Sequence, residues 1–179
     1  MTAEAARNRL FSETFAKVAE QVDDWTAPTP VPEWRAKDIV EHLLDWFPEM
    51  LHSWTGLSLE PRTESTLLKR WRVRADEVQT LLEDDAISGR AVEAGPFAGQ
   101  ELRAVIDQLY TADIFMHTWD LARAADVPAP LDSQYAADLL AGLQRMEDVI
   151  RASGQFGTAK ETDSTHSVDR LMAFIGREV

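Results

Sequence analysis

Apolar residues recur at intervals of three and four along most of the chain, which is the period of an α-helix with one buried face. The pattern predicts helices over residues 3–22, 36–54, 64–82, 101–125, 132–152 and 164–175. Only the loop at 88–100 carries a strand-like feature, a short extended pairing expected around 91–93. The chain is therefore predicted to be all-α.

Prolines and short polar runs separate the predicted helices. Pro28, Pro30 and Pro32 follow the first helix, and Pro48 falls inside the second, where it is expected to kink or shorten that helix. Helices joined by modest connections favour a bundle, in which inward-facing side chains of neighbouring helices build cofactor sites. At 179 residues we expect one domain, over 1–179.

The acidic composition of the chain argues against some classes of binding partner. A formal net charge of −13 and the lack of a basic cluster argue against nucleic acid and anionic membranes. No signal-peptide core and no apolar run of membrane-spanning length is visible, so a cytoplasmic location is expected. The chain has no cysteine, so any thiol chemistry must use a thiol from outside the protein.

The most informative chemistry is an acid and a histidine four residues apart, Asp113 and His117, inside an apolar run. On a helix this spacing places both side chains on one face, with Cβ atoms about 5–6 Å apart. A carboxylate without a partner is costly to bury, and a cation would offset that cost. His42, on the second predicted helix, is the candidate third ligand.

Spacing alone is weak evidence, because 31 of the 179 residues are acidic and about one histidine in six has an acid four positions upstream by chance. His42 itself follows Asp38 at this spacing. Asp38, however, falls in the first turn of its predicted helix, where a carboxylate is favoured for structural reasons. Asp113 lies about three turns into its helix and has no such structural explanation.

Alternatives remain for each residue. Asp113 and His117 could form a simple hydrogen-bonded pair, and Asp120, one turn after His117, could orient that ring or replace Asp113 as the carboxylate ligand. Trp46 and Tyr110 share helix faces with the candidate ligands, so either pocket lining or core packing would explain them.

Several segments resemble a known family when taken together. These are Trp25–Trp34 leading into Arg35–Leu43, the run Asp113–Ala124, and the ending Asp169–Arg177. They are similar to the DinB-like metal-binding bundles, and within them to the actinobacterial branch related to the N-terminal domain of mycothiol-dependent maleylpyruvate isomerase. The isomerase has a glutamate where this chain has Asp113.

This resemblance implies an up-down four-helix bundle with extra short helices. It also implies a divalent ion, zinc or nickel, held by His42, Asp113 and His117. A mycothiol-like thiol is the implied co-substrate, and a thiol transferase or isomerase acting on small molecules is the implied activity.

The ligand set supports more than one chemistry without the family. Two histidines and a carboxylate leave a divalent ion with net charge +1 and open positions, as catalytic sites have. A bound water would give a hydrolase nucleophile and a bound thiol a transferase or isomerase nucleophile. Iron(II) oxygen chemistry uses the same ligands. A non-catalytic metal-binding or sensing module, as monomer or homodimer, is the alternative to an enzyme.

Overall fold

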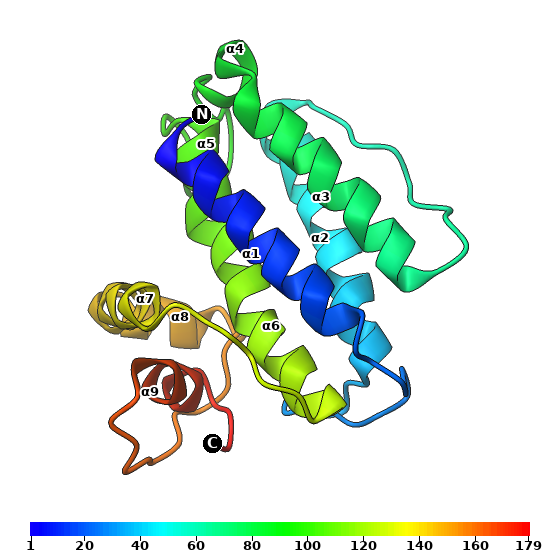
Figure 1. Cartoon of the computed structure of the whole chain (residues 1–179). Coiled ribbons are helices and arrows are strands. Elements are labelled where there is room, and N and C mark those ends of the chain that lie inside the picture. The colour runs from blue at the N-terminus through cyan, green and yellow to red at the C-terminus, as the bar shows by residue number, and fades with distance from the viewer. The chain divides into compact units, whose positions relative to one another are not determined.

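The computed structural model describes all 179 residues and consists of helices and their connections (Figure 1). The contacts of β type are isolated bridges, Pro28 with Arg35 and Ala91 with Glu101. The all-α prediction is confirmed, and the extended pairing expected near residues 91–93 is reduced to the second bridge. No helix is long and apolar enough to cross a membrane.

The chain divides into two compact units. The first comprises Met1–Thr29 and Glu33–Pro128, and the second comprises Pro30–Pro32 and Ala129–Val179. A single domain over the whole chain stays a prediction. The elements of the first unit are α1 (Ala3–Ala19), α2 (Ala36–Thr55), α3 (Leu67–Glu83), α4 (Asp85–Ser88), α5 (Leu102–Ile106), the π-helical segment η1 (Asp107–Thr111) and α6 (Ala112–Ala125).

Four long helices form the bundle of the first unit. Helices α1 and α2 each pack against both α3 and α6, so the four close a ring around one core. Aromatic pairs join neighbouring helices, with ring centroids 4.4 Å apart for Phe15 and Trp71 and 5.0 Å apart for Phe11 and Phe115. The fully buried core side chains include Phe15, Ile39, Leu43, Phe47, Trp71, Val78, Ile106, Tyr110 and Phe115.

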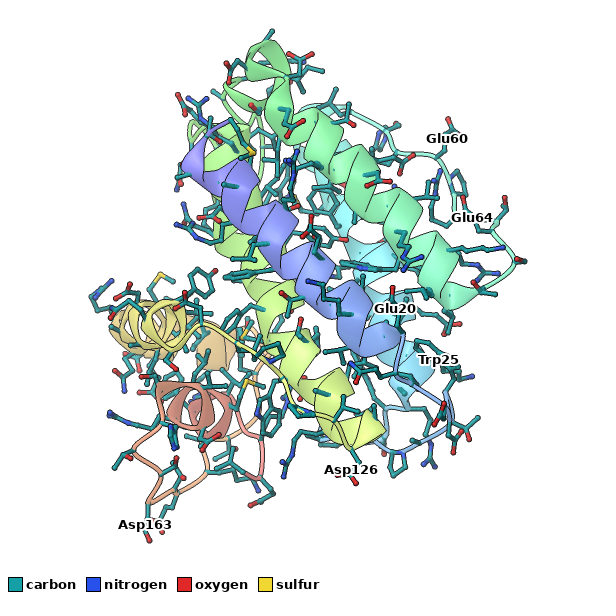
Figure 2. All side chains as sticks on the ribbon, in the orientation of Figure 1. Glu20, Trp25, Glu60, Glu64, Asp126 and Asp163 are labelled. Atoms are coloured by element: carbon teal, nitrogen blue, oxygen red, sulfur yellow. The ribbon has the colours of Figure 1, made fainter.

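One connection departs from a strict up-and-down order. Helices α2 and α3 run in the same direction, so the segment 56–66 returns along the bundle before α3 begins (Figure 1). Arginines of α3 tie this segment down: Arg74 donates to the carbonyl of Glu60 at 3.0 Å and Arg70 to the carbonyl of Glu64 at 2.9 Å. Glu60 and Glu64 lie along this segment beside α3 (Figure 2). Bundles with one long crossover are a known variant of this architecture.

The beginnings and ends of the helices follow from local sequence. Thr2 accepts a hydrogen bond from the backbone N–H of Ala5, and Asp38 accepts one from the N–H of Arg35 at 2.7 Å. The second bond confirms that Asp38 serves the start of α2. Gly56 ends α2 with φ of 71°, which a residue without Cβ adopts at no steric cost.

Pro48 does not shorten α2, contrary to one of the outcomes expected from the sequence. The helix continues from Ala36 to Thr55 through the proline. The missing N–H removes one hydrogen bond, but tertiary packing of the helix's apolar face outweighs this loss. Ile39, Leu43, Phe47 and Leu51 are fully buried on that face.

The predicted helix over 101–125 is not regular. It consists of α5, then the π-helical segment η1, then α6. A π turn contains one more residue than an α turn, so Asp113 and His117 are rotated relative to the residues of α5. Both ends of η1 contact α1, through Arg7 with Asp107 and through Asn8 with Thr111 at 2.8 Å. Periodicity alone did not reveal this segment.

The second unit contains α7 (Ser133–Arg145), α8 (Glu147–Ala152) and α9 (Ser167–Phe174), with α7 packed on α9. The single helix predicted over 132–152 is therefore divided near Met146. Arg151 of α8 donates to the carbonyl of Phe174 at 2.7 Å. Gly176 follows α9 and has φ of 99°. A Cβ at this position would lie 2.8 Å from the Cα of Gly157, so the close approach of the two backbones requires glycine.

Arg74 should be important for stability because its guanidinium is only 2% exposed and pairs with Glu77 at 2.9 Å. Arg74→Ala would leave its partners without that charge and free the 56–66 segment, and we expect a loss of about 3 kcal/mol in the free energy of unfolding. The control is Arg72→Ala on the same helix, whose pair with Glu20 is about half exposed, with an expected loss of about 0–1 kcal/mol. Urea denaturation measures both, and equal losses would contradict the prediction.

Candidate metal centre

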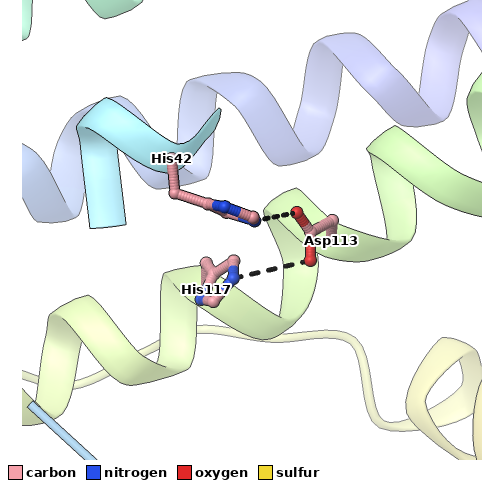
Figure 3. A group of neighbouring side chains, drawn as sticks. All are labelled: His42, Asp113 and His117. Atoms are coloured by element: carbon pink, nitrogen blue, oxygen red, sulfur yellow. Dashed lines mark hydrogen bonds and ion pairs between the residues drawn. The ribbon is translucent and has the colours of Figure 1, made fainter. Parts of the chain in front are cut away.

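Three side chains from two helices converge inside the first unit. His42 comes from α2, and Asp113 and His117 come from successive turns of α6 (Figure 3). His42 Nε2 lies 3.0 Å from Asp113 Oδ2, and His117 Nε2 lies 3.5 Å from Asp113 Oδ1. One ligand atom from each of the three residues lies within 4.8 Å of the others. The structure thus brings together the three residues that the sequence predicts as ligands.

The carboxylate of Asp113 is the centre of this cluster. Burial by itself would raise the pKa of Asp113, but the charge of His117, the contact with His42 and the Trp46 hydrogen bond together lower the pKa below its usual value. The indole Nε1–H of Trp46 donates to Asp113 Oδ2 at 2.9 Å. Asp113 therefore offers an ionised carboxylate at neutral pH.

His117 is oriented by a second acid. Its Nδ1 lies 3.0 Å from Oδ2 of Asp120, which is fully buried. A carboxylate accepts hydrogen bonds, so Asp120 favours a proton on Nδ1 of His117, and Nε2 is the nitrogen that faces Asp113. A carboxylate behind a histidine is a common arrangement at metal sites. Asp120 contacts Nδ1 of His117, whereas Nε2 faces the cluster. This position suits a residue that orients the ring and not a metal ligand.

The donor set fits a divalent ion. In tetrahedral zinc sites with nitrogen and oxygen ligands, the ligand atoms lie about 3.3 Å apart. The separations of 3.0 and 3.5 Å run to different oxygens of Asp113, and one ligand atom from each of the three residues lies within 4.8 Å of the others. Side-chain movements would therefore bring the three atoms to the spacing of a zinc site.

Trp34 is the member of the site that sequence reasoning missed as a site residue. Its ring is stacked on His117, with 5.6 Å between centroids and 20° between planes, and lies 5.0 Å from His42. Trp34 precedes α2 in the loop joined by the Pro28–Arg35 bridge. The residue belongs to the Trp25–Trp34 segment, but no spacing rule connects a loop tryptophan to histidines on two helices.

Trp46 and Tyr110 are both near the cluster. Trp46 contacts Asp113 directly, whereas Tyr110 is fully buried and donates its hydroxyl to the carbonyl of Leu43 at 3.1 Å. Tyr110 also stacks on Phe47, with centroids 4.1 Å apart. Burial raises the pKa of the Tyr110 hydroxyl well above its usual value, so this group stays protonated. A pocket-lining role stays a prediction for both residues.

The family model for the mycothiol maleylpyruvate isomerase N-terminal domain matches residues 9–122. The chain belongs to this family. The match includes His42, Asp113, His117 and Asp120, and it ends within α6, before the helices of the second unit.

Two relatives extend beyond the family domain. Uncharacterized proteins from two strains of Mycobacterium tuberculosis, CDC 1551 and H37Rv, are each 27% identical to the chain over 175 residues. The alignments cover 93% of the chain and 93% of each relative. No solved structure matches the chain significantly. Family membership and the three-residue cluster together make a divalent-metal-binding role plausible.

The two acids of this family member should differ in their effect on metal binding. Asp113→Asn keeps the size of the side chain but removes the anion at the centre of the cluster, so affinity for zinc should fall strongly. Asp120→Asn changes only the partner of His117 and should cost about 10–100-fold. Competition titration with a chromogenic chelator measures both affinities. The reverse ranking would move the ligand assignment to Asp120.

Proposed function

We propose that this protein is a metal-dependent enzyme acting on small molecules, of the thiol-transferase or isomerase type, with a mycothiol-like thiol as co-substrate. The observation that carries the proposal is the convergence of His42, Asp113 and His117 within 4.8 Å. The thiol is proposed from the name of the family, and the absence of cysteine means that the chain supplies no thiol of its own.

The charge and number of the ligands favour catalysis over a structural role. Structural zinc sites close the coordination shell with four protein ligands, whereas catalytic sites use three. The three side chains contribute a single negative charge, so a divalent ion, zinc or nickel in this proposal, would keep a net charge of +1. Such an ion would hold a thiol as its thiolate or make a bound water acidic near neutral pH.

The site is accessible from the side of His42. The side chain of His42 is 31% exposed and that of Asp113 is 19% exposed, whereas His117 is 7% exposed. In this proposal a small thiol would approach past His42, while His117, held by Asp120 and stacked on Trp34, forms the buried side.

Two other functions share the same ligands. A hydrolase would use water in place of the thiol, and the partial exposure of His42 admits water equally well. A non-catalytic metal-binding or sensing module would hold the ion without turnover. Thiol binding distinguishes the first proposal from both.

Purified wild-type protein, expressed with zinc or nickel available, should contain close to one divalent ion per chain. His42→Ala removes a neutral ligand and should lower this content strongly while keeping most helicity, because packing dominates the stability of a bundle. His52→Ala is the matched control on α2, since His52 is exposed and pairs with Ser58. Elemental analysis and circular dichroism measure both properties. Wild-type protein without metal under these conditions would refute the proposed function.

Cobalt substitution tests the thiol directly. Adding mycothiol or a small analogue to cobalt-loaded protein should produce a thiolate-to-cobalt charge-transfer band and release a proton. The band should be absent in His117→Ala. If no band appears but simple esters or amides are cleaved, the hydrolase replaces the thiol enzyme. If neither occurs, the binding module is supported.

A further inference from the structure

Trp46 contacts the cluster through a hydrogen bond but is not a candidate ligand. It lies on α2, whereas Asp113 lies on α6. It lies one turn after His42 on α2 and donates its indole N–H to Asp113 Oδ2 at 2.9 Å. We propose that Trp46 is a positioning residue that keeps the Asp113 carboxylate aimed at the metal when an ion binds. The proposal rests on the proposed metal site.

Contacts from α2 hold the Asp113 carboxylate at a single oxygen. Two groups of α2 contact the same oxygen, Oδ2: His42 Nε2 at 3.0 Å and Trp46 Nε1 at 2.9 Å. An imidazole nitrogen that binds an ion uses its lone pair and therefore carries no proton. If His42 held an ion through Nε2, that nitrogen would carry no proton and would not donate to Asp113.

The indole cannot change roles in this way. Its nitrogen is a donor only and has no lone pair for a metal. The hydrogen bond from Trp46 to Oδ2 therefore persists after the ion binds and continues to link α2 to the carboxylate. Without this bond, α2 would keep no hydrogen bond to the Asp113 carboxylate once His42 held the ion.

The indole is itself held by the core. Its ring lies 5.7 Å from that of Tyr110 and 6.1 Å from that of Phe47, in edge-on arrangements. Tyr110 is fixed in turn by its hydroxyl bond to Leu43 and its stack on Phe47. The donor is thus part of a rigid aromatic group, which is the type of support that improves the geometry of a metal site. This explains a buried tyrosine so close to the cluster.

Trp46→Phe tests the proposal because phenylalanine keeps a planar apolar ring and removes the donor. We expect zinc affinity to fall about 10–100-fold, as for loss of other groups that orient metal ligands. The matched control is Trp71→Phe, which removes another buried indole hydrogen bond, to the carbonyl of Ser12 at 3.2 Å, on the other side of the core. Trp71→Phe should lower stability and leave zinc affinity unchanged.

A spectroscopic measurement distinguishes positioning from general destabilisation. The indole N–H resonance of Trp46, assigned through its sequential connectivities in wild-type protein, should show a hydrogen-bonded shift with and without zinc. Asp113→Asn should move that resonance. This measurement uses wild-type protein, so it holds even if Trp46→Phe folds poorly.

The outcomes separate the two proposals. Wild-type protein that binds zinc, together with a Trp46→Phe variant of equal affinity, would overturn the positioning role and leave the metal site intact. Loss of the hydrogen-bonded shift on zinc loading would do the same. Wild-type protein that binds no ion would overturn the metal site, and the positioning role with it.

Discussion

The carboxylate of Asp113 is the constraint on which the site depends, because an anion inside a helical bundle must be compensated. Its compensation comes from two directions: His42 and Trp46 reach it from α2, and His117 reaches it from the next turn of α6. These contacts lower the pKa of Asp113 against the effect of burial. The contacts that stabilise this anion also place two imidazole nitrogens next to it. A carboxylate and two imidazoles form the donor set of a metal site.

Three layers of contacts support this centre. Asp120 fixes the ring of His117 from behind, and Trp34 covers both imidazoles from the loop before α2. Tyr110 fixes the neighbourhood of Trp46 through its bond to Leu43. Asp120 and Trp34 contact candidate ligands directly, and Tyr110 acts through Trp46. Of the three candidate ligands, His42 has the most exposed side chain, at 31%.

The packing of the bundle decides how α6 presents its residues. The π-helical segment η1 ends two residues before Asp113, and its Asp107 and Thr111 contact Arg7 and Asn8 of α1. One extra residue in a turn rotates everything that follows on the helix. The contacts with α1 thus help to fix the direction in which the Asp113–His117 pair points.

The sequence by itself determined the helical class, the approximate position of each helix and the identity of the three residues that converge. These follow from local rules: apolar spacing defines the buried faces, and a four-residue separation places Asp113 and His117 on the same face of a helix. His42 is the candidate third ligand from its own helical run, and the family resemblance implies the same residue.

Only the tertiary structure decided the rest. The choice between Asp113 and Asp120 for the centre of the cluster depends on which ring nitrogen of His117 each acid faces. The tertiary structure also revealed four further features. These are the parallel course of α2 and α3, the π turn, the continuity of α2 through Pro48 and the position of Trp34. Each of these depends on contacts between residues far apart in the chain, and the free energy of such contacts is not contained in any local pattern of residues.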